Sequence, residues 1–187
     1  YTYFSRLPDS GSPLNAATIP NGVYSVGGNV GNTLARLPES RGAGVILKSN
    51  GNFTISRDII VNNSNLSRAS DITQVVIVAD NITIDENVKQ IDAWLITSPT
   101  GSINTCGYGG TLVSGRCGDT LSINGPIYTN RLLLRRTAGA NPPTPADLAT
   151  PAERFNLRPD AQLWAYTYAN KADYAQTDFV QELPPRY

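Results

Sequence analysis

The chain contains no histidine and no methionine, and only two of its 187 residues are cysteines. Without histidine it cannot form a Ser-His-Asp triad, a Cys-His pair or a histidine-ligated zinc, copper or haem site. Two cysteines are too few for a cysteine-only zinc or iron–sulfur site. Carboxylate chemistry is the one remaining route to catalysis, so the composition favours a non-enzymatic protein that needs no cofactor.

Net charge and long apolar runs are also lacking. The 15 basic residues balance 15 acidic ones, which argues against nucleic acid or an anionic membrane surface as a partner. No run approaches the roughly 18 apolar residues of a membrane span, so we expect no direct membrane insertion by this segment. The first residues, Tyr1-Thr2-Tyr3-Phe4, show no signal-peptide pattern. Such a start suits a trimmed mature product and equally a piece of a longer protein.

Short apolar runs rich in β-branched residues recur along the middle of the chain, separated by Asn, Asp, Gly and Ser. Their length and their turn-residue boundaries favour strands, because none of them shows a helical period. The predicted strands centre on residues 23–26, 45–47, 53–55, 59–61, 75–78, 82–84, 93–96, 121–123, 127–128 and 132–134.

Three segments share a pattern of polar, Asn or Thr, apolar, Thr or Ser, Ile and polar residues. They are residues 51–56, 80–85 and, more loosely, 119–124. One short strand per repeat, with a period of about 20 to 50 residues, is typical of a solenoid. Parallel stacking would place the apolar pairs of all three copies in one ladder and Asn52 above Asn81 at a corner. We therefore predict an all-β fold, a parallel β-helix over residues 23–137, with an antiparallel sandwich or barrel as the alternative.

The two ends of the chain differ from this central part. Residues 1–22 are predicted as an irregular N-terminal arm that lies on another surface. Residues 138–187 are predicted as a proline-rich linker and a capping or docking tail. Within them, Thr150-Pro151-Ala152-Glu153 resembles the start of a helical turn. A short helix is predicted from Asp160 to about residue 172, although the spacing of the aromatic residues there also suits a strand.

The tail is the most aromatic part of the chain. Its aromatic residues form a candidate docking or sugar-stacking surface: Trp164, Tyr166, Tyr168 and Tyr174. The end of a solenoid exposes unpaired strand edges that must be capped or paired. We therefore expect Trp164 and the tyrosines near it to cover the open end of the solenoid.

The two cysteines, Cys106 and Cys117, enclose a glycine-rich segment. A reactive thiol pair would favour a C-x-x-C spacing or a nearby base, and neither is present. We predict a structural disulfide, which stabilises a loop of this size by about 2–3 kcal/mol in the chain-entropy model. A disulfide indicates an oxidising compartment.

Carboxylates are the weak catalytic candidates. Asp80, Asp85 and Asp92, with Glu86 beside them, are expected on neighbouring corners, where they could act as an acid–base pair on a polysaccharide or offer oxygen ligands to calcium. Asp at turns is more often simple turn chemistry, so we predict no catalytic and no metal site. A cluster of arginines, Arg131, Arg135 and Arg136, is expected on a solvated face.

A family resemblance rests on residues 75–84, 88–96, Cys106, Cys117, 121–125 and 130–137, joined by 151–157 and 182–187. In these segments the chain resembles an uncharacterised group of secreted or surface-anchored β-helical proteins from epibiotic bacteria with reduced genomes. The resemblance covers about two-thirds of the chain. It implies a β-helix outside the cell, usually behind a signal or a membrane segment, and it provides no catalytic residues.

Together these features predict an extracellular structural or adhesive protein of a bacterial cell surface, able to self-assemble into a filament or array. Its expected partners are copies of itself or a host-cell surface. One alternative is a carbohydrate-active β-helix, a lyase or hydrolase that uses Asp and Glu. The other is a solenoid that polymerises inside the cell as a cytoskeletal element.

Overall fold

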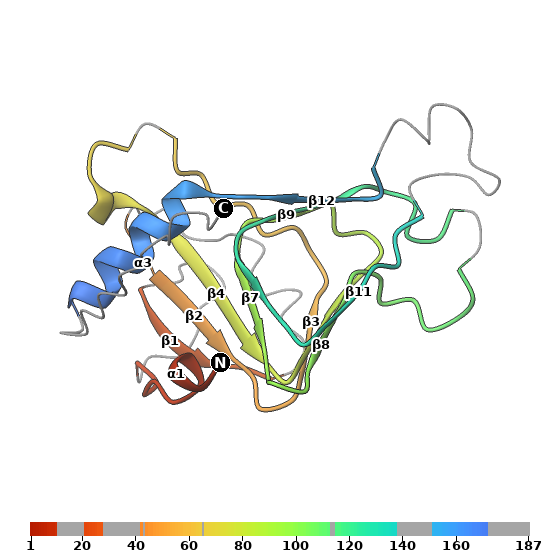
Figure 1. Cartoon of the computed structure of the whole chain (residues 1–187), viewed down its shortest axis with the longest axis horizontal. Helices are drawn as coiled ribbons and strands as arrows, with labels where there is room; N and C mark the ends of the chain where they lie inside the picture. Colours follow the sequence, from red (N-terminus) through yellow and green to blue (C-terminus); the bar gives the residue numbers. More distant parts are fainter. Residues whose placement is uncertain are drawn as a thin grey trace, which may run out of the picture.

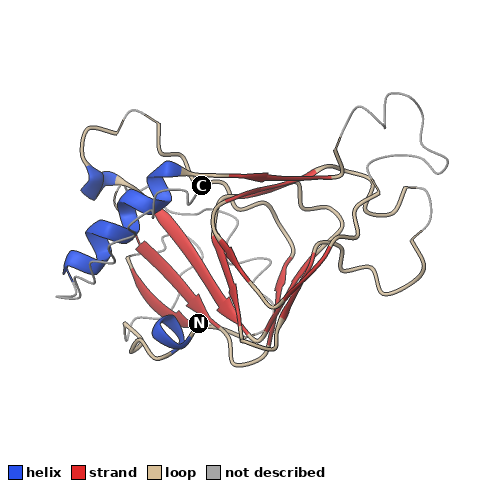
Figure 2. Cartoon of the chain, in the orientation of Figure 1, coloured by secondary structure: helices blue, strands red, loops and turns tan. Residues whose placement is uncertain are grey.

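A computed structural model describes residues 1–10, 21–27, 42, 44–64, 66–112, 115–137 and 151–171. This part of the chain is mostly β-structure, as predicted. Its helical elements lie beside the strands (Figure 2): the one-turn helix α1 (Thr2–Ser5), the 3₁₀ helix η1 (Ala69–Asp71) and the longer helix α3 (Pro159–Lys171). The helix predicted from Asp160 is therefore confirmed.

The strands form three sheets. The first has the order β1 (Gly22–Ser25), β2 (Gly44–Lys48), β4 (Gln74–Ala79), β7 (Trp94–Thr97), β10 (Ile127–Tyr128). The second has the order β11 (Arg131–Leu133), β8 (Ser102–Asn104), β5 (Asn81–Ile84), β3 (Asn52–Ile55). The third has the order β12 (Glu153–Asn156), β9 (Leu121–Asn124), β6 (Gln90–Ile91).

Every strand pair of the described residues is parallel, so the alternative of an antiparallel sandwich is wrong. From β4 onward the chain visits the first, second and third sheets in turn, three times over. We call one such passage a circuit. The three sheets bound a roughly triangular space (Figure 1), which side chains fill.

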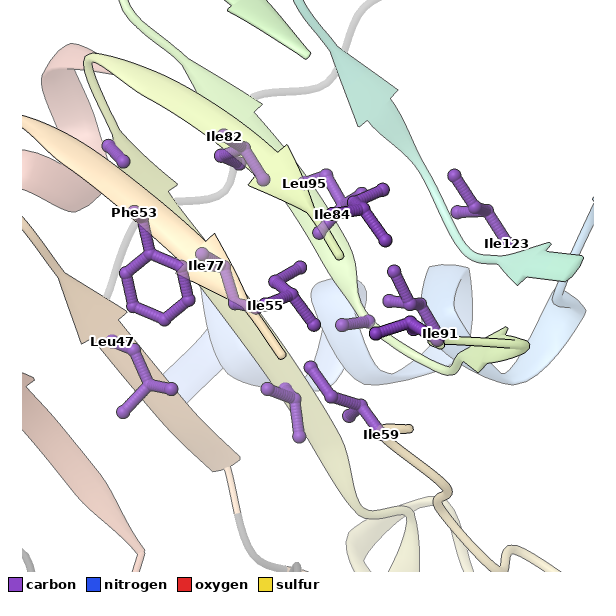
Figure 3. Close-up of a cluster of buried hydrophobic side chains, with 14 of the residues drawn as sticks. Leu47, Phe53, Ile55, Ile59, Ile77, Ile82, Ile84, Ile91, Leu95 and Ile123 are labelled. Carbon is purple, nitrogen blue, oxygen red and sulfur yellow. The ribbon is translucent and has the colours of Figure 1, made fainter. Parts of the chain in front are cut away.

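Alternate residues of each strand point into that space. Parallel register places like residues above one another: Val45 beside Val75, Ile77 beside Leu95, and Ile91 beside Ile123. They belong to an inner cluster of buried, mostly aliphatic side chains (Figure 3). Burial of one such side chain is worth about 2 kcal/mol. No single strand could bury its apolar face alone, so each strand is stabilised by packing against the circuits stacked next to it.

Side-chain amides connect successive circuits at the corners. The predicted position of Asn52 above Asn81 is confirmed, because Asn81 Nδ2 donates to Asn52 Oδ1 at 3.0 Å. Asn81 Oδ1 accepts the Ser102 amide at 3.0 Å, which continues the ladder. Gly101, which immediately precedes Ser102, passes so close to the Asp80 carbonyl that a Cβ at this position would overlap the carbonyl oxygen. Only glycine fits this corner.

Several strand predictions are corrected. The third copy of the repeat, residues 119–124, does not continue the ladder of the other two, because β9 lies in the third sheet and β3 and β5 lie in the second. Residues 59–61 form no named strand, and Ile59 makes only an isolated parallel bridge to Ile91. The helical turn expected at residues 150–153 is wrong, since Glu153 begins strand β12, which pairs with β9. The short strands β6 and β8 were not predicted.

The outer face of the first sheet carries a second cluster. It is made of buried residues of three strands, of α3 and of the position that follows η1: Ile46, Ile72, Val76, Val78, Trp94, Ile96, Ala161 and Trp164. Trp164 meets Trp94 edge to face, with ring centroids 6.0 Å apart, and Tyr168 stacks on Trp164 at 4.9 Å. The expectation that Trp164 covers the open end of a solenoid is therefore corrected: α3 covers a face.

The described first part of the N-terminal arm, residues 1–10, also lies on this outer face. Phe4 and Leu7 pack against the outer cluster. The Tyr1 hydroxyl donates to Asp80 Oδ1 at 3.0 Å, and Asp9 pairs with Lys48 at 2.9 Å. The arm is not wholly irregular, because it contains α1.

Candidate functional site

The carboxylates proposed from the sequence are not assembled into one exposed group. Asp80 precedes β5 and Asp85 follows it, so the two lie at opposite ends of one strand. Glu86 pairs with Arg116 at 2.9 Å. Among the described residues no group of three or more His, Cys, Asp or Glu side chains is placed to hold a metal ion.

Asp92 is a structural carboxylate. Its side chain is 5% exposed, and its oxygens accept the Val61 amide at 2.9 Å and the Asn124 side-chain amide at 2.6 Å. Gln90 Nε2 donates to both oxygens, and Arg158 lies 3.6 Å away. All these donors come from the chain itself, so the carboxylate ties neighbouring circuits and the segment before α3 together.

Asp160 extends this polar cluster to the first turn of α3. Arg158 binds it through two nitrogens, and Asn63 Nδ2 donates to it at 2.6 Å. Burial acts to raise the pKa of Asp160, but the hydrogen bonds from Arg158 and Asn63 outweigh it and lower the pKa below the ordinary 3.8. The cluster fastens α3 to the loop before β4.

The expectation of a solvated arginine face is wrong for Arg136. This residue is 7% exposed, and its guanidinium donates to three backbone carbonyls: Thr105 at 2.6 Å, Glu86 at 2.8 Å and Asp85 at 2.8 Å. Burial lowers its pKa. Arg131 is exposed, as predicted, and Arg135 is half-buried, with one nitrogen 3.1 Å from the Gly110 carbonyl. Arg136 thus supplies hydrogen bonds to backbone carbonyls of two earlier circuits that lie outside the strands.

The disulfide between Cys106 and Cys117 is confirmed, with the two Cα atoms 6.0 Å apart. It closes a loop that leaves the stack after β8. The Thr137 amide donates to the Cys117 carbonyl at 3.0 Å, so the base of the loop is also held by the chain that follows β11. The bond suggests a compartment that is not reducing.

The last circuit presents the most distinctive surface. Strands β10, β11 and β12 are the final members of their sheets, and no further strand pairs with them among the described residues. Register places Ile127 beside Leu95, Leu132 beside Ile103, and Phe155 beside Ile123. The inner columns therefore end here without a covering layer from the described part of the chain.

Exposed apolar side chains surround this end. Phe155 is 45% exposed and Leu157, just beyond β12, is 75% exposed. The exposed apolar residues in or just beyond the three terminal strands, which we call the open-end surface, are Tyr128, Leu133, Leu134, Phe155 and Leu157. Of these, Tyr128 also stacks on Trp94, with ring centroids 6.3 Å apart. Apolar exposure next to free strand edges is typical of an interaction surface.

The opposite end of the first sheet is closed differently. There the edge of β1 is occupied by the arm, because the Ser10 amide donates to the Val23 carbonyl at 2.9 Å and the Val23 amide donates to Ser10 Oγ at 2.7 Å. One serine thus takes the place of a neighbouring strand. The two ends of this sheet are not equivalent.

The open-end surface and the burial of Arg136 were not predicted from the sequence. The signal for β12 was present: residues 153–156 end in apolar-Asn, as residues 121–124 do, and Asn156 Nδ2 bonds Asn124 Oδ1 across a separation of 32 residues. The aromatic candidates divide: Trp164 and Tyr168 join the outer face, and Tyr166 is 71% exposed. Tyr174 lies outside the described residues.

Comparison of the chain with protein families, with curated proteins and with solved structures finds no match. The resemblance to surface β-helical proteins therefore stays a prediction. Among the described helices, none combines the length and the apolar character that crossing a membrane requires.

Proposed function

We propose that the chain is an extracellular β-solenoid, a parallel β-helix, with a structural or adhesive role at a bacterial cell surface, and that it self-associates through the open-end surface. The cyclic order of the three parallel sheets supports the solenoid. Stacked inner columns and amide ladders are what a solenoid needs, because each circuit contacts only its neighbours. The disulfide supports a location outside the cytoplasm.

The open-end surface is the observation that carries the self-association. Unpaired edges of three parallel strands, flanked by exposed apolar side chains, lie together at one end. The sequence favours the N-terminal arm and the aromatic tail, which contains α3, as segments that dock on a neighbour. Their described residues pack on the chain's own first sheet, so they give no support to that route.

The closed edge of β1 favours a symmetric pair over a filament. Head-to-tail stacking of β10 onto β1 of the next molecule would have to displace Ser10 from Val23. A two-fold pairing of open ends needs only one kind of surface and closes on itself. The expected assembly is therefore a dimer joined at its open ends.

Neither alternative function gains support from the geometry. The best placed carboxylate of a lyase or hydrolase, Asp92, is buried and bound by four groups of the chain. A cytoskeletal solenoid would work among reduced thiols, which the Cys106–Cys117 bond does not suit.

The experiment is a mass measurement by light scattering after size-exclusion chromatography, over a range of concentrations, on the full chain. Phe155→Lys places a charge on the open-end surface and should shift the dimer to monomer. Leu163→Lys, at a 56% exposed site of α3, is the matched control and should leave the dimer intact. A monomer at every concentration, or equal behaviour of the two variants, contradicts the proposal.

The location is tested separately. Mass spectrometry of protein alkylated inside living cells should find Cys106 and Cys117 joined. Two alkylated thiols in the native protein would instead favour the cytoskeletal alternative.

A further inference from the structure

A second candidate site lies away from the open end, between α3, η1 and the start of β2. It is a cavity of about 250 Å³. Its walls combine residues from distant parts of the chain: Asn21, Gly42, Gly44, Ala69, Ser70, Ile72, Trp164, Thr167 and Tyr168. Concave sites with an apolar wall and a few polar groups are the usual form of small-molecule sites.

No Asp, Glu, Lys or Arg is among these lining residues. An ionic ligand would lose its hydration without gaining a charged partner, which is costly. The polar groups of the lining side chains are one amide, from Asn21, one indole N–H, from Trp164, and three hydroxyls, from Ser70, Thr167 and Tyr168. The Tyr168 hydroxyl is a donor at neutral pH, as an ordinary tyrosine is, and burial raises its pKa further. The cavity suits a neutral ligand that both donates and accepts hydrogen bonds.

The apolar wall is aromatic and firmly held. Trp164 is fixed between Trp94 and Tyr168, at ring-centroid distances of 6.0 and 4.9 Å. Asn21 is oriented by the Gly44 amide, which donates to its Oδ1 at 2.9 Å, so its NH₂ group is the donor that it can offer. A site that is held in place before binding loses less entropy when the ligand arrives.

Glycine keeps the cavity open at the start of β2. A Cβ at Gly44 would lie 3.0 Å from Trp164 Cζ2 and 3.2 Å from Asn21 Oδ1. Any side chain there would compete with the aromatic wall for the same space. The two residues that would be displaced are one aromatic and one polar lining group.

From these features we propose that the cavity binds one neutral pyranose ring, a single sugar unit at the end of a glycan. A pyranose presents C–H bonds, which suit the edge of Trp164 and the apolar lining residues Ala69 and Ile72. It also presents a rim of hydroxyls, which matches the polar groups of the lining. Its lack of charge matches the lining. The inference goes beyond the self-association proposed above, because it names a ligand class for an adhesive surface.

The test uses saturation-transfer NMR and calorimetry on the full chain with the methyl pyranosides of glucose, galactose, mannose and N-acetylglucosamine. At least one should bind, with a dissociation constant of about 1 mM. Thr167→Val removes one hydroxyl at constant shape, and Tyr168→Leu removes the ring and its hydroxyl. Each should weaken binding about tenfold or more.

Tyr166→Leu is the matched control, since Tyr166 belongs to the same helix, is 71% exposed and is not a lining residue. It should leave the affinity unchanged. The proposal is overturned if none of the four pyranosides binds, or if the Thr167→Val and Tyr168→Leu variants bind as well as the parent chain. It is also overturned if Tyr166→Leu alone abolishes binding, because the sugar would then stack on the helix surface. Thermal unfolding checks that each variant is folded.

The dimer mass separates this test from that of the proposed function. Thr167→Val should keep the parent mass in light scattering while losing sugar affinity. Phe155→Lys should lose the dimer and keep the affinity.

Discussion

The first sheet has two buried faces that are built in different ways. On the inner face, Val45, Val75 and Leu95 lie in columns to which successive circuits add one aliphatic residue each. On the outer face, Trp94 and its neighbours are covered by Trp164 from α3 and Phe4 from the arm, which come from opposite ends of the described chain. The inner face is formed by residues that recur from circuit to circuit, whereas the outer face is covered by segments that occur only once.

The difference shows what each face requires. A parallel sheet is stable only when both of its faces are covered. The inner face is covered by the other two sheets as the circuits stack, so it needs nothing beyond the repeat. The outer face has no such partner and depends on side chains that no repeat supplies. Loss of an inner residue should therefore weaken the whole molecule, and loss of an outer one should first release its cover.

The largest expected effect is on the inner face. Leu95→Ala removes a fully buried side chain and should lower the free energy of unfolding by about 3–4 kcal/mol. Urea unfolding followed by circular dichroism measures it. Leu163→Ala makes the same chemical change at a 56% exposed site and should cost less than about 1 kcal/mol. Equal losses for the two variants would contradict the inner columns.

Trp164→Ala tests the outer face. If the substitution destabilised the whole fold, the free energy of unfolding would fall by about 3 kcal/mol. We expect a local effect instead: faster amide hydrogen exchange in residues 159–168, with β4 and β7 still protected. Tyr166→Ala, on the exposed side of α3, should leave both regions unchanged. Loss of protection in β4 together with α3 would show that the two faces act as one unit.

Arg136→Met is expected to cost about 2 kcal/mol, because the carbonyls of Glu86 and Thr105 lose the guanidinium donor and that of Asp85 keeps only the Val88 amide. Arg131→Met removes the same charge from an exposed position of β11 and is the control. Chemical denaturation of both variants decides between a buried structural arginine and a solvated one. A loss as small as that of Arg131→Met would restore the original prediction of a solvated face.

The smallest effect concerns acid. Because the pKa of Asp160 is lowered in the folded chain, the unfolded chain binds more protons as the pH falls through the range below 3.8. The stability that the Arg158–Asp160 pair gives to α3 is therefore present at neutral pH and is lost in that acidic range. Asp160→Asn should be less stable at neutral pH and show a shallower acid dependence. Parallel pH profiles for the two chains would disprove this role.

The inner structure was largely predictable, because short parallel strands leave a local pattern in the sequence. Apolar runs with turn residues between them located most strands, and the repeat placed Asn52 above Asn81 correctly. The helix after Asp160 followed from composition, and the disulfide from the spacing of two cysteines.

The remaining features depend on contacts between residues far apart in the chain. The sequence around Arg136 contains no pattern that predicts its contacts with three carbonyls of earlier circuits. Residues 119–124 match residues 51–56 in pattern, but a pattern of alternation does not say which of three sheets a strand will join. The cavity beside Trp164 draws its walls from the start of β2, η1 and α3, which no local window contains.

The amide ladders at the corners have a direction. Asn81 donates to Asn52, Asn124 donates to Asp92, and Asn156 donates to Asn124, so each later residue binds an acceptor on an earlier circuit. In these three pairs a new circuit finds its acceptors already in place on the circuit before it, whereas Asp92 and the carbonyls that Arg136 binds wait for residues that follow. We therefore expect the polypeptide to fold in the order of its synthesis, each circuit serving as a template for the next while the rest is still being translated. The outer cover of α3, which comes after the last strand, would then be added at the end.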